Sequence, residues 1–170
     1  MKRTEQSPRQ TMIPLEPHAP PRRPVASEAQ TSVLLVEEEG DDAAVCQYLL
    51  EREGLTVLRA RTRREGADIA REQQPQLVVV DATLSDGGGY ELAMELKLMP
   101  ALAQVPVVGL SAFSSHAEAP EPPPDVFAAF LTKPIQREAF SRTIRDLLAT
   151  RTERSVKQRR DRPLRMDRQG

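Results

Sequence analysis

The sequence predicts an α/β protein, in which a doubly wound parallel sheet of five strands is covered by helices on both faces. Two observations lead to this fold class. Short apolar runs such as "VLLV", "LVVV" and "VPVVGL" are continuous instead of alternating with polar residues, as is typical of strands that are buried on both faces. Longer amphipathic stretches separate these runs, and strands that alternate with helices favour a parallel sheet with right-handed crossovers.

The five strands are expected where the apolar runs occur. We place them at Ser32–Val36, Leu55–Arg59, Gln76–Val80, Val105–Leu110 and Phe127–Leu131. Each run has the length of an ordinary strand.

The first two helices are predicted between the first three strands. "DDAAVCQYLLEREG" ends at Gly54, a common helix stop, and four apolar residues in it have helical spacing: Val45, Tyr48, Leu49 and Leu50. "TRREGADIAREQ" begins at Thr62, and Glu65 three residues later completes the spacing of a capping box. Gly66 lowers the helix propensity of this second segment.

Two further helices are predicted after the third and fifth strands. "YELAMELKLM" aligns Leu92, Leu96 and Met99 on one face and is closed by Pro100. The last helix is expected at Ile135–Thr150, just after Pro134, with one apolar stripe formed by Phe140, Ile144, Leu147 and Leu148.

The segment between the last two strands, "HAEAPEPPPDVF", argues against a regular helix there. Four of its residues are prolines, namely Pro120, Pro122, Pro123 and Pro124. Proline lacks the backbone N–H that a helix interior needs and also restricts the residue before it. We therefore expect the fourth helix of the fold to be short or missing and Ser114–Asp125 to be an irregular loop.

Charge and composition divide the chain into three parts. Residues 1–31 are rich in proline and poor in apolar residues, which predicts a disordered leader, with a docking motif for a proline-binding partner as the alternative. Residues 32–150 carry 11 basic and 19 acidic residues and form the predicted domain. Residues 151–170 carry eight basic and three acidic residues. They read as a solvated or disordered tail that can extend the last helix to about Arg160, and contact with nucleic acid or an anionic surface is the alternative.

The expected compartment follows from what the sequence lacks. Its one cysteine, Cys46, cannot form an internal disulfide and suits a reducing compartment. The chain contains neither an apolar run long enough to span a membrane nor the apolar core of a signal peptide. We therefore expect a cytoplasmic protein without a membrane span.

Polar residues gather at the predicted carboxyl ends of four strands. Glu37, Glu38 and Glu39 follow the first strand, and Asp81, Ser111 and Lys133 follow the third, fourth and fifth. In a doubly wound sheet these ends meet at one edge, where ligands bind. Crowded carboxylates raise one another's pKa unless a cation neutralises them, and oxygen ligands without His or Cys favour Mg²⁺ or Mn²⁺.

The other members of this cluster suit phosphoryl transfer. The ammonium of Lys133 can pair with a carboxylate at rest and with a phosphoryl oxygen during transfer, and the hydroxyl of Ser111 can follow that oxygen. A carboxylate acceptor, a metal and a cation are the parts that such a site needs.

Several segments, in the right order, resemble the receiver domain of two-component response regulators. "VLLVEEEGDDAAVCQYLLEREGLTV" is similar to the family's first strand, acidic pair and helix. "LVVVDATLSDGGGYEL" is similar to the segment around the phosphorylated aspartate, "VVGLSA" to the switch hydroxyl, and "FLTKPI" to the lysine before a proline. The resemblance covers about residues 32–150 and implies a flavodoxin-like receiver fold.

The resemblance also implies roles for individual residues. Asp81 is the expected phosphoacceptor, with Lys133 and Ser111 as the other catalytic groups, and Ser111 and Phe130 form the expected switch. A weakly bound Mg²⁺ or Mn²⁺ would be held by a set of four residues: Glu38, Asp81, Thr83 through its backbone oxygen, and Glu37 through a water molecule.

The implied function is that of a stand-alone receiver that is not an enzyme. A histidine kinase or phosphotransfer protein would phosphorylate Asp81, and the added charge would switch a surface that binds a separate output protein, since no output domain fits in the 20 tail residues. The alternative is a receiver-like interaction scaffold that is not phosphorylated. An aspartyl-phosphate phosphatase is disfavoured, because such enzymes need a second acid two residues after the first, where Thr83 stands.

Two departures from the family pattern affect the site. The acidic pair usually contains aspartate at the metal-binding position, whereas Glu37 and Glu38 stand here, and the longer side chain suits octahedral Mg²⁺ less well. The proline usual after the acceptor turn is Ser85, followed by three glycines, which predicts a looser loop.

Overall fold

The structure, a computed structural model, describes residues 30–112 and 125–160. Their elements are, in chain order, β1 (Ser32–Val36), α1 (Asp41–Arg52), β2 (Thr56–Ala60), α2 (Arg63–Gln73), β3 (Leu77–Asp81), α3 (Gly89–Leu98), β4 (Val107–Ser111), β5 (Ala129–Thr132) and α4 (Arg137–Arg160). All neighbouring strands pair in parallel, in the order β2-β1-β3-β4-β5. This order confirms the predicted doubly wound sheet, in which the strand order reverses between β1 and β3.

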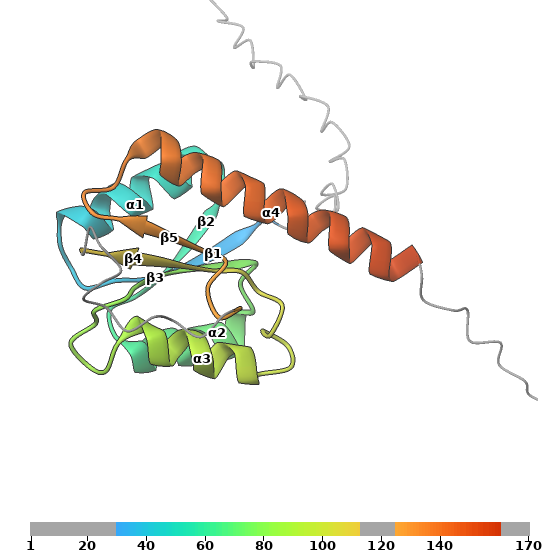
Figure 1. The fold of residues 1–170 in the computed structure, drawn as a ribbon, viewed down its shortest axis with the longest axis horizontal. Coiled ribbons are helices and arrows are strands. Elements are labelled where there is room, and N and C mark those ends of the chain that lie inside the picture. Colours follow the sequence, from blue (N-terminus) through green and yellow to red (C-terminus); the bar gives the residue numbers. More distant parts are fainter. Residues whose placement is uncertain (1–29, 113–124, 161–170) are drawn as a thin grey trace, which may run out of the picture.

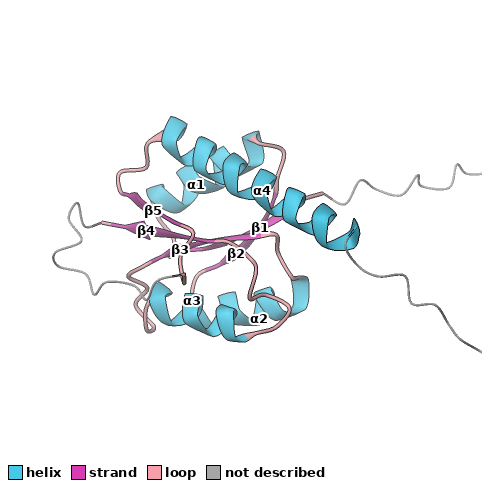
Figure 2. Cartoon of the chain, turned by 45° about the vertical axis from the view of Figure 1, so that its right-hand side comes forward, coloured by secondary structure: helices cyan, strands magenta, loops and turns pink. Residues whose placement is uncertain are grey.

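The sheet lies between two layers of helices. Helices α1 and α4 cover one face, and α2 and α3 cover the other (Figures 1 and 2). Leu34, Val36, Val78 and Val80 point into the cluster under α2 and α3, whereas Val33, Leu35, Leu77 and Val79 point into the cluster under α1 and α4. Because both sets are fully buried, the strands need apolar residues at every position, which explains the continuous runs.

The helix starts follow local sequence signals in part. Thr62 caps α2, because its hydroxyl accepts a hydrogen bond from the Glu65 N–H, as the capping-box spacing predicts. Gly66 brings this helix close to β1, since a Cβ there would lie 2.9 Å from a methyl carbon of Val36. The glycine that lowers helix propensity is thus required for the close packing of α2 on the sheet.

The predicted apolar face of α1 is wrong in half of its residues. Leu49 and Leu50 are buried as expected, but Val45 and Tyr48 are 43% and 53% exposed. The small side chains of Ala43 and Cys46 are buried with these two leucines. At 100° per residue, Val45 and Tyr48 lie on the opposite side of the helix from these two residues, so the four residues of the prediction could not all face the core.

The last two strands, β4 and β5, each begin two residues later than predicted. The predictions began β4 at residue 105 and β5 at residue 127, whereas the strands begin at Val107 and Ala129. Val105 closes a turn by donating its N–H to Leu102, and Pro106 has no N–H to give to a neighbouring strand. The predicted irregular loop at 114–125 lies almost wholly outside the described residues. The described residues contain four helices, and the segment 113–124, where we expect the fourth helix of the fold to be short or missing, lies outside them.

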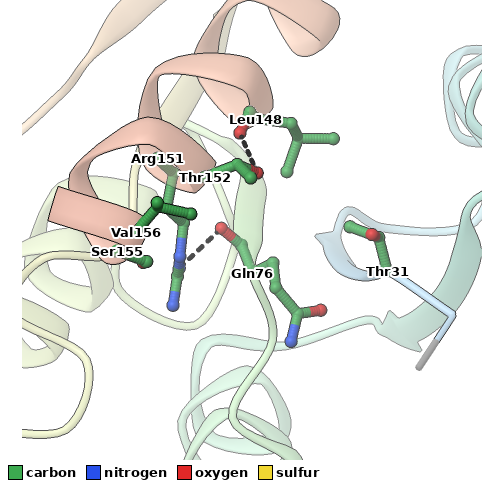
Figure 3. Close-up of a pocket in the computed structure, with 7 residues that line it drawn as sticks. All are labelled: Thr31, Gln76, Leu148, Arg151, Thr152, Ser155 and Val156. Atoms are coloured by element: carbon green, nitrogen blue, oxygen red, sulfur yellow. Dashed lines mark hydrogen bonds between the residues drawn. The ribbon is translucent and has the colours of Figure 1, made fainter. Parts of the chain in front are cut away.

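Helix α4 continues past residue 150 to Arg160, the longer of the two ends that the sequence allows. Its last turns project beyond the sheet (Figures 1 and 2). Arg151 ties this part to the body of the protein by donating from Nη1 to the carbonyl oxygen of Gln76 at 2.7 Å, across a cavity of about 360 Å³ (Figure 3). No helix in the described ranges has the length and apolar character needed to cross a membrane.

Candidate functional site

The candidate site lies at the carboxyl ends of β1, β3, β4 and β5. The register places Asp81 beside Leu110, so the acceptor candidate and Ser111 end neighbouring strands. Past the last paired residues, the N–H of Lys133 donates to the carbonyl oxygen of Ser111 at 2.8 Å, which carries the ladder one step further. The fold therefore brings Glu37, Asp81, Ser111 and Lys133 to one edge, next to the reversal of strand order where sites form in such sheets.

Lys133 is the centre of the charge cluster. Its ammonium donates to Asp81 Oδ2 at 2.6 Å and to Glu37 Oε1 at 2.7 Å, and Asp42 Oδ2 lies 3.7 Å away. The side chains of Lys133 and Asp81 are 16% and 13% exposed, and Glu37 is the buried charged residue of the described chain. One ammonium thus compensates two largely buried carboxylates and a third at longer range.

The three groups respond differently to this arrangement. Burial raises the pKa of Glu37, and the hydrogen bond and charge of Lys133 only partly oppose it. For Asp81, burial also acts upward, but the hydrogen bonds from Lys133 and Thr83 outweigh it and leave the pKa below the ordinary value of 3.8. Burial acts to lower the pKa of Lys133, yet its two carboxylate partners raise it above the ordinary value of 10.5. Asp81 is therefore ionised at neutral pH, and its partner Lys133 is charged.

The second oxygen of Asp81 is held by the chain that follows it. Oδ1 accepts from the Thr83 N–H at 2.7 Å and from the Thr83 hydroxyl at 2.9 Å. Gly89 then returns to the same point, where a Cβ would lie 2.1 Å from the carbonyl oxygen of Asp81. Only glycine allows the start of α3 to approach the end of β3 this closely.

Glu38, the predicted direct metal ligand, lies against the β3–α3 loop. Its Oε1 accepts from the backbone N–H of Ser85 at 2.8 Å. Hydrogen bonds from the side chain and backbone of Ser85 lower the pKa of Glu38, although nearby Asp81 acts in the opposite direction. The same loop is tied to α2, since Asp86 accepts from the N–H groups of Arg63 and Arg64. The predicted looseness of this glycine-rich loop is thus opposed by two ties to neighbouring elements.

Phe130, the predicted aromatic switch, packs on a gap in the neighbouring strand. A Cβ on Gly109 would lie 2.3 Å from a ring carbon of Phe130, so the glycine provides the space that the ring occupies. The ring centroid lies 4.4 Å from that of Phe127 and 6.1 Å from that of Tyr90. Phe130 therefore belongs to a half-buried cluster of three aromatic rings beside β4 and β5.

The carboxylates at this edge do not form a metal site as they lie. Within residues 30–112 and 125–160, no three acidic, histidine or cysteine side chains converge as ligands. Glu37 Oε2 does remain buried without a hydrogen-bond partner. The predicted ligand atoms at this edge are all oxygens, which Mg²⁺ prefers. However, the ammonium of Lys133 takes the other oxygens of Glu37 and Asp81, and Glu38 is engaged by Ser85. The predicted ligand set, with the backbone oxygen of Thr83, stays a prediction.

Comparison with known proteins decides the family. Residues 33–145 match the family model described as the response regulator receiver domain. This chain belongs to the response regulator receiver family. Its receiver domain is 30% identical over 117 residues to the polar-differentiation response regulator DivK of Brucella ovis, a match that covers 69% of this chain and 95% of that protein. The family implied by the sequence motifs is thereby confirmed.

Solved structures share the fold of the receiver domain. CheY4, a chemotaxis response regulator of Vibrio cholerae, is 19% identical, with a TM-score of 0.64 over 69% of this chain and 98% of that one. The receiver domain of a sensor histidine kinase from Pseudomonas aeruginosa is 20% identical, with a TM-score of 0.64 over 71% and 99%. That receiver was solved with a magnesium ion coordinated in its active-site cleft. The expected flavodoxin-like fold is confirmed by these likenesses.

The sequence analysis missed two contributors to the site of this receiver domain. Gly109, which provides the space for Phe130, carries a readable signal, because a glycine inside a strand pattern indicates a close approach. The N–H of Ser85 carries only an indirect one, the absence of proline at its position. Nothing in the sequence states that Glu38 would reach across to this N–H.

Proposed function

We propose that this receiver domain accepts one phosphoryl group on Asp81 from the phosphohistidine of a histidine kinase or phosphotransfer protein. Receiver domains of this family act as signalling modules with such partners. The observation that carries the proposal is the pairing of Asp81 Oδ2 with the Lys133 ammonium at 2.6 Å, at the switch point of the sheet.

In the proposed step, a carboxylate oxygen of Asp81 attacks the phosphorus atom. A new O–P bond forms, the P–N bond of the phosphohistidine breaks, and the imidazole nitrogen keeps the electron pair. The lowered pKa of Asp81 keeps the attacking group ionised, so no base is needed to remove a proton. Lys133 is already within hydrogen-bond distance of the carboxylate and can follow the charge onto the phosphoryl oxygens.

The product differs from the resting site mainly in charge. A phosphoryl group adds more negative charge than the single carboxylate it covers, and the same Lys133 and the neighbouring Ser111 would face it. We propose that Ser111 and Phe130 respond to it and change the surface at β4 and β5 that binds a separate output protein. The half-buried aromatic cluster with Phe127 and Tyr90 supports this, because rearranging it would alter a surface that is partly open to solvent.

The test is the mass of the intact protein after incubation with a small-molecule acyl phosphate and Mg²⁺. The parent and an Asp68→Asn control, which changes an exposed carboxylate on α2, should each gain one phosphoryl group. Asp81→Asn should gain none, because the amide cannot act as the acceptor. Absence of label on the parent, or label that persists on Asp81→Asn, would contradict the proposal.

A receiver-like scaffold without phosphorylation is the second candidate function. The observation that favours it is the position of Glu38, which is bound to Ser85 and leaves the edge without a converged set of metal ligands. The scaffold function predicts that Asp81→Asn leaves partner binding unchanged, whereas phosphoryl switching predicts that binding depends on the label.

We further propose a cytoplasmic location, where histidine kinases of this signalling class phosphorylate their receivers.

A further inference from the structure

Glu38 and Ser85 connect two loops of the candidate site. They are 47 positions apart, and the 2.8 Å hydrogen bond between Oε1 and the Ser85 N–H joins the β1–α1 loop to the β3–α3 loop. Glu37 and Asp81 are already engaged with Lys133, so Glu38 is the predicted ligand with the most freedom to turn toward a cation. Its partner at the β3–α3 loop is therefore in direct competition with any divalent ion at this edge.

The competing N–H exists because residue 85 is not proline. Leu84 to Gly87 form a turn, in which the Leu84 carbonyl oxygen accepts from the N–H groups of Gly87 and Gly88 at 3.4 and 3.2 Å. Ser85 is the second residue of this turn, a position that suits proline well. Proline there would keep the turn and remove the donor, and Glu38 would lose its backbone partner.

We propose that Ser85 is a positioning residue that holds Glu38 on the β3–α3 loop and thereby weakens the binding of a divalent cation at the acidic edge. In this chain the Glu38 carboxylate accepts from the Ser85 N–H, so this contact between two loops must break before Glu38 can bind a metal ion. The inference rests on the proposed function only for the nature of its ligand, a divalent cation.

The first test measures Mn²⁺ affinity by calorimetry for three full-length proteins. Ser85→Pro removes both the N–H and the hydroxyl that face Glu38, whereas Ser85→Ala removes only the hydroxyl, so the difference between the two variants isolates the N–H. Because one hydrogen bond to a charged group is released, Ser85→Pro should bind Mn²⁺ about tenfold more tightly than Ser85→Ala. Equal affinities for Ser85→Pro and Ser85→Ala, or no binding by any of the three proteins, would overturn the inference.

A double-mutant cycle separates the contact from a general stiffening of the loop. If the contact is the cause, the gain from Ser85→Pro should disappear in a Glu38→Ala background, because the competing carboxylate is then absent. A gain of the same size in that background would overturn the inference.

The unmodified protein gives a measurement that does not depend on the folding of variants. Titration with Mg²⁺ should move the Ser85 amide resonance upfield with the same dissociation constant as the site, and an unmoved resonance at saturation contradicts the contact's release.

The outcome can be told apart from a failure of the proposed function. Phosphodonor labelling of the same proteins reports on Asp81, and the cation titrations report on Glu38 and Ser85. Tighter Mn²⁺ binding by Ser85→Pro without any label would retain the inference and refute phosphoryl acceptance. Label on the parent with unchanged affinities would do the reverse.

Discussion

Replacing Lys133 with methionine tests how far one ammonium stabilises the acidic edge. Methionine keeps the length of the side chain but leaves Glu37 and Asp81 without the donor that lies 2.7 and 2.6 Å from their oxygens. Both carboxylates are largely buried, and breaking a buried ion pair by removing one partner costs about 3–5 kcal/mol. We take the lower end, about 3 kcal/mol, because Asp81 keeps its two bonds from Thr83. For a domain of this size that corresponds to a fall of roughly 12 °C in Tm.

The pH dependence gives the prediction its sign. In the parent, the lowered pKa of Asp81 contributes stability that is present above its ordinary value of 3.8 and is lost as pH falls through the folded value. Without Lys133, less opposes the upward effect of burial on the pKa of Asp81. The pKa of Glu37, already above its ordinary value of 4.5, rises further. A raised carboxyl pKa gives stability below the unfolded value that is lost as pH rises. The gap between Lys133→Met and the parent should therefore widen as pH rises above the ordinary carboxyl values of 3.8 and 4.5 toward neutral pH.

Urea unfolding of the parent and the variant at several pH values measures this gap, with Lys157→Met on the exposed part of α4 as the control. The control should change the free energy of unfolding by less than about 0.5 kcal/mol. A loss for Lys133→Met below about 1 kcal/mol near neutral pH would refute the reasoning, because the carboxylates would then be solvated in spite of their burial. A difference in the free energy of unfolding between Lys133→Met and the parent that narrows as pH rises would also refute the reasoning.

Two further predictions concern close approaches by glycine. Gly89→Ala would place its Cβ 2.1 Å from the carbonyl oxygen of Asp81, so it should lower the free energy of unfolding by more than about 3 kcal/mol, whereas Gly40→Ala, with nothing within 4 Å, should cost about 1 kcal/mol or less. Chemical denaturation measures both, and similar losses would contradict the first. Gly109→Ala would place a Cβ 2.3 Å from the Phe130 ring, so the ring should leave its position at a cost of about 1–3 kcal/mol. Aromatic NMR contacts between the three rings should then weaken, and an unchanged set would show that the strand yields instead.

The sheet could be predicted from the sequence because the burial of each strand determines the residue types within that strand alone. A strand that is covered on both faces must be apolar at each position, and the runs in β1, β3 and β4 show this directly. The face of α1 was predicted less well, because Val45 and Tyr48 share the helical spacing of the apolar residues but are exposed, whereas Ala43 and Cys46 are buried. The close packing of that helix on the sheet selects small side chains, and only the assembled fold shows this.

The candidate site divides along the same line. The order of strands brings Asp81, Ser111 and Lys133 to one edge, and parallel-sheet topology makes that placement predictable from the positions of strand ends. The direction of the Glu38 side chain was not predictable, since it depends on a donor 47 residues away in another loop. The prediction that residues 32–150 suffice as a folded domain is still to be measured, and the contact of Arg151 with Gln76 indicates that truncation at 150 would remove a tertiary tie.

The charge balance around Lys133 suggests how phosphorylation would act beyond Asp81. At rest, Lys133 divides its hydrogen bonds between Asp81 and Glu37, and Glu37 already has one buried oxygen without a partner. A phosphoryl group on Asp81 would draw the ammonium toward its own oxygens, because it offers more negative charge than the carboxylate did. Glu37 would then lose its compensating cation while still buried, which is costly unless it takes up a proton, binds a cation or turns toward solvent. A turn of Glu37 toward solvent would move the β1–α1 loop, in which Glu38 is bound to Ser85. The signal is therefore expected to spread to the β1 side of the site as well as through Ser111 and Phe130, and both routes begin at one ammonium.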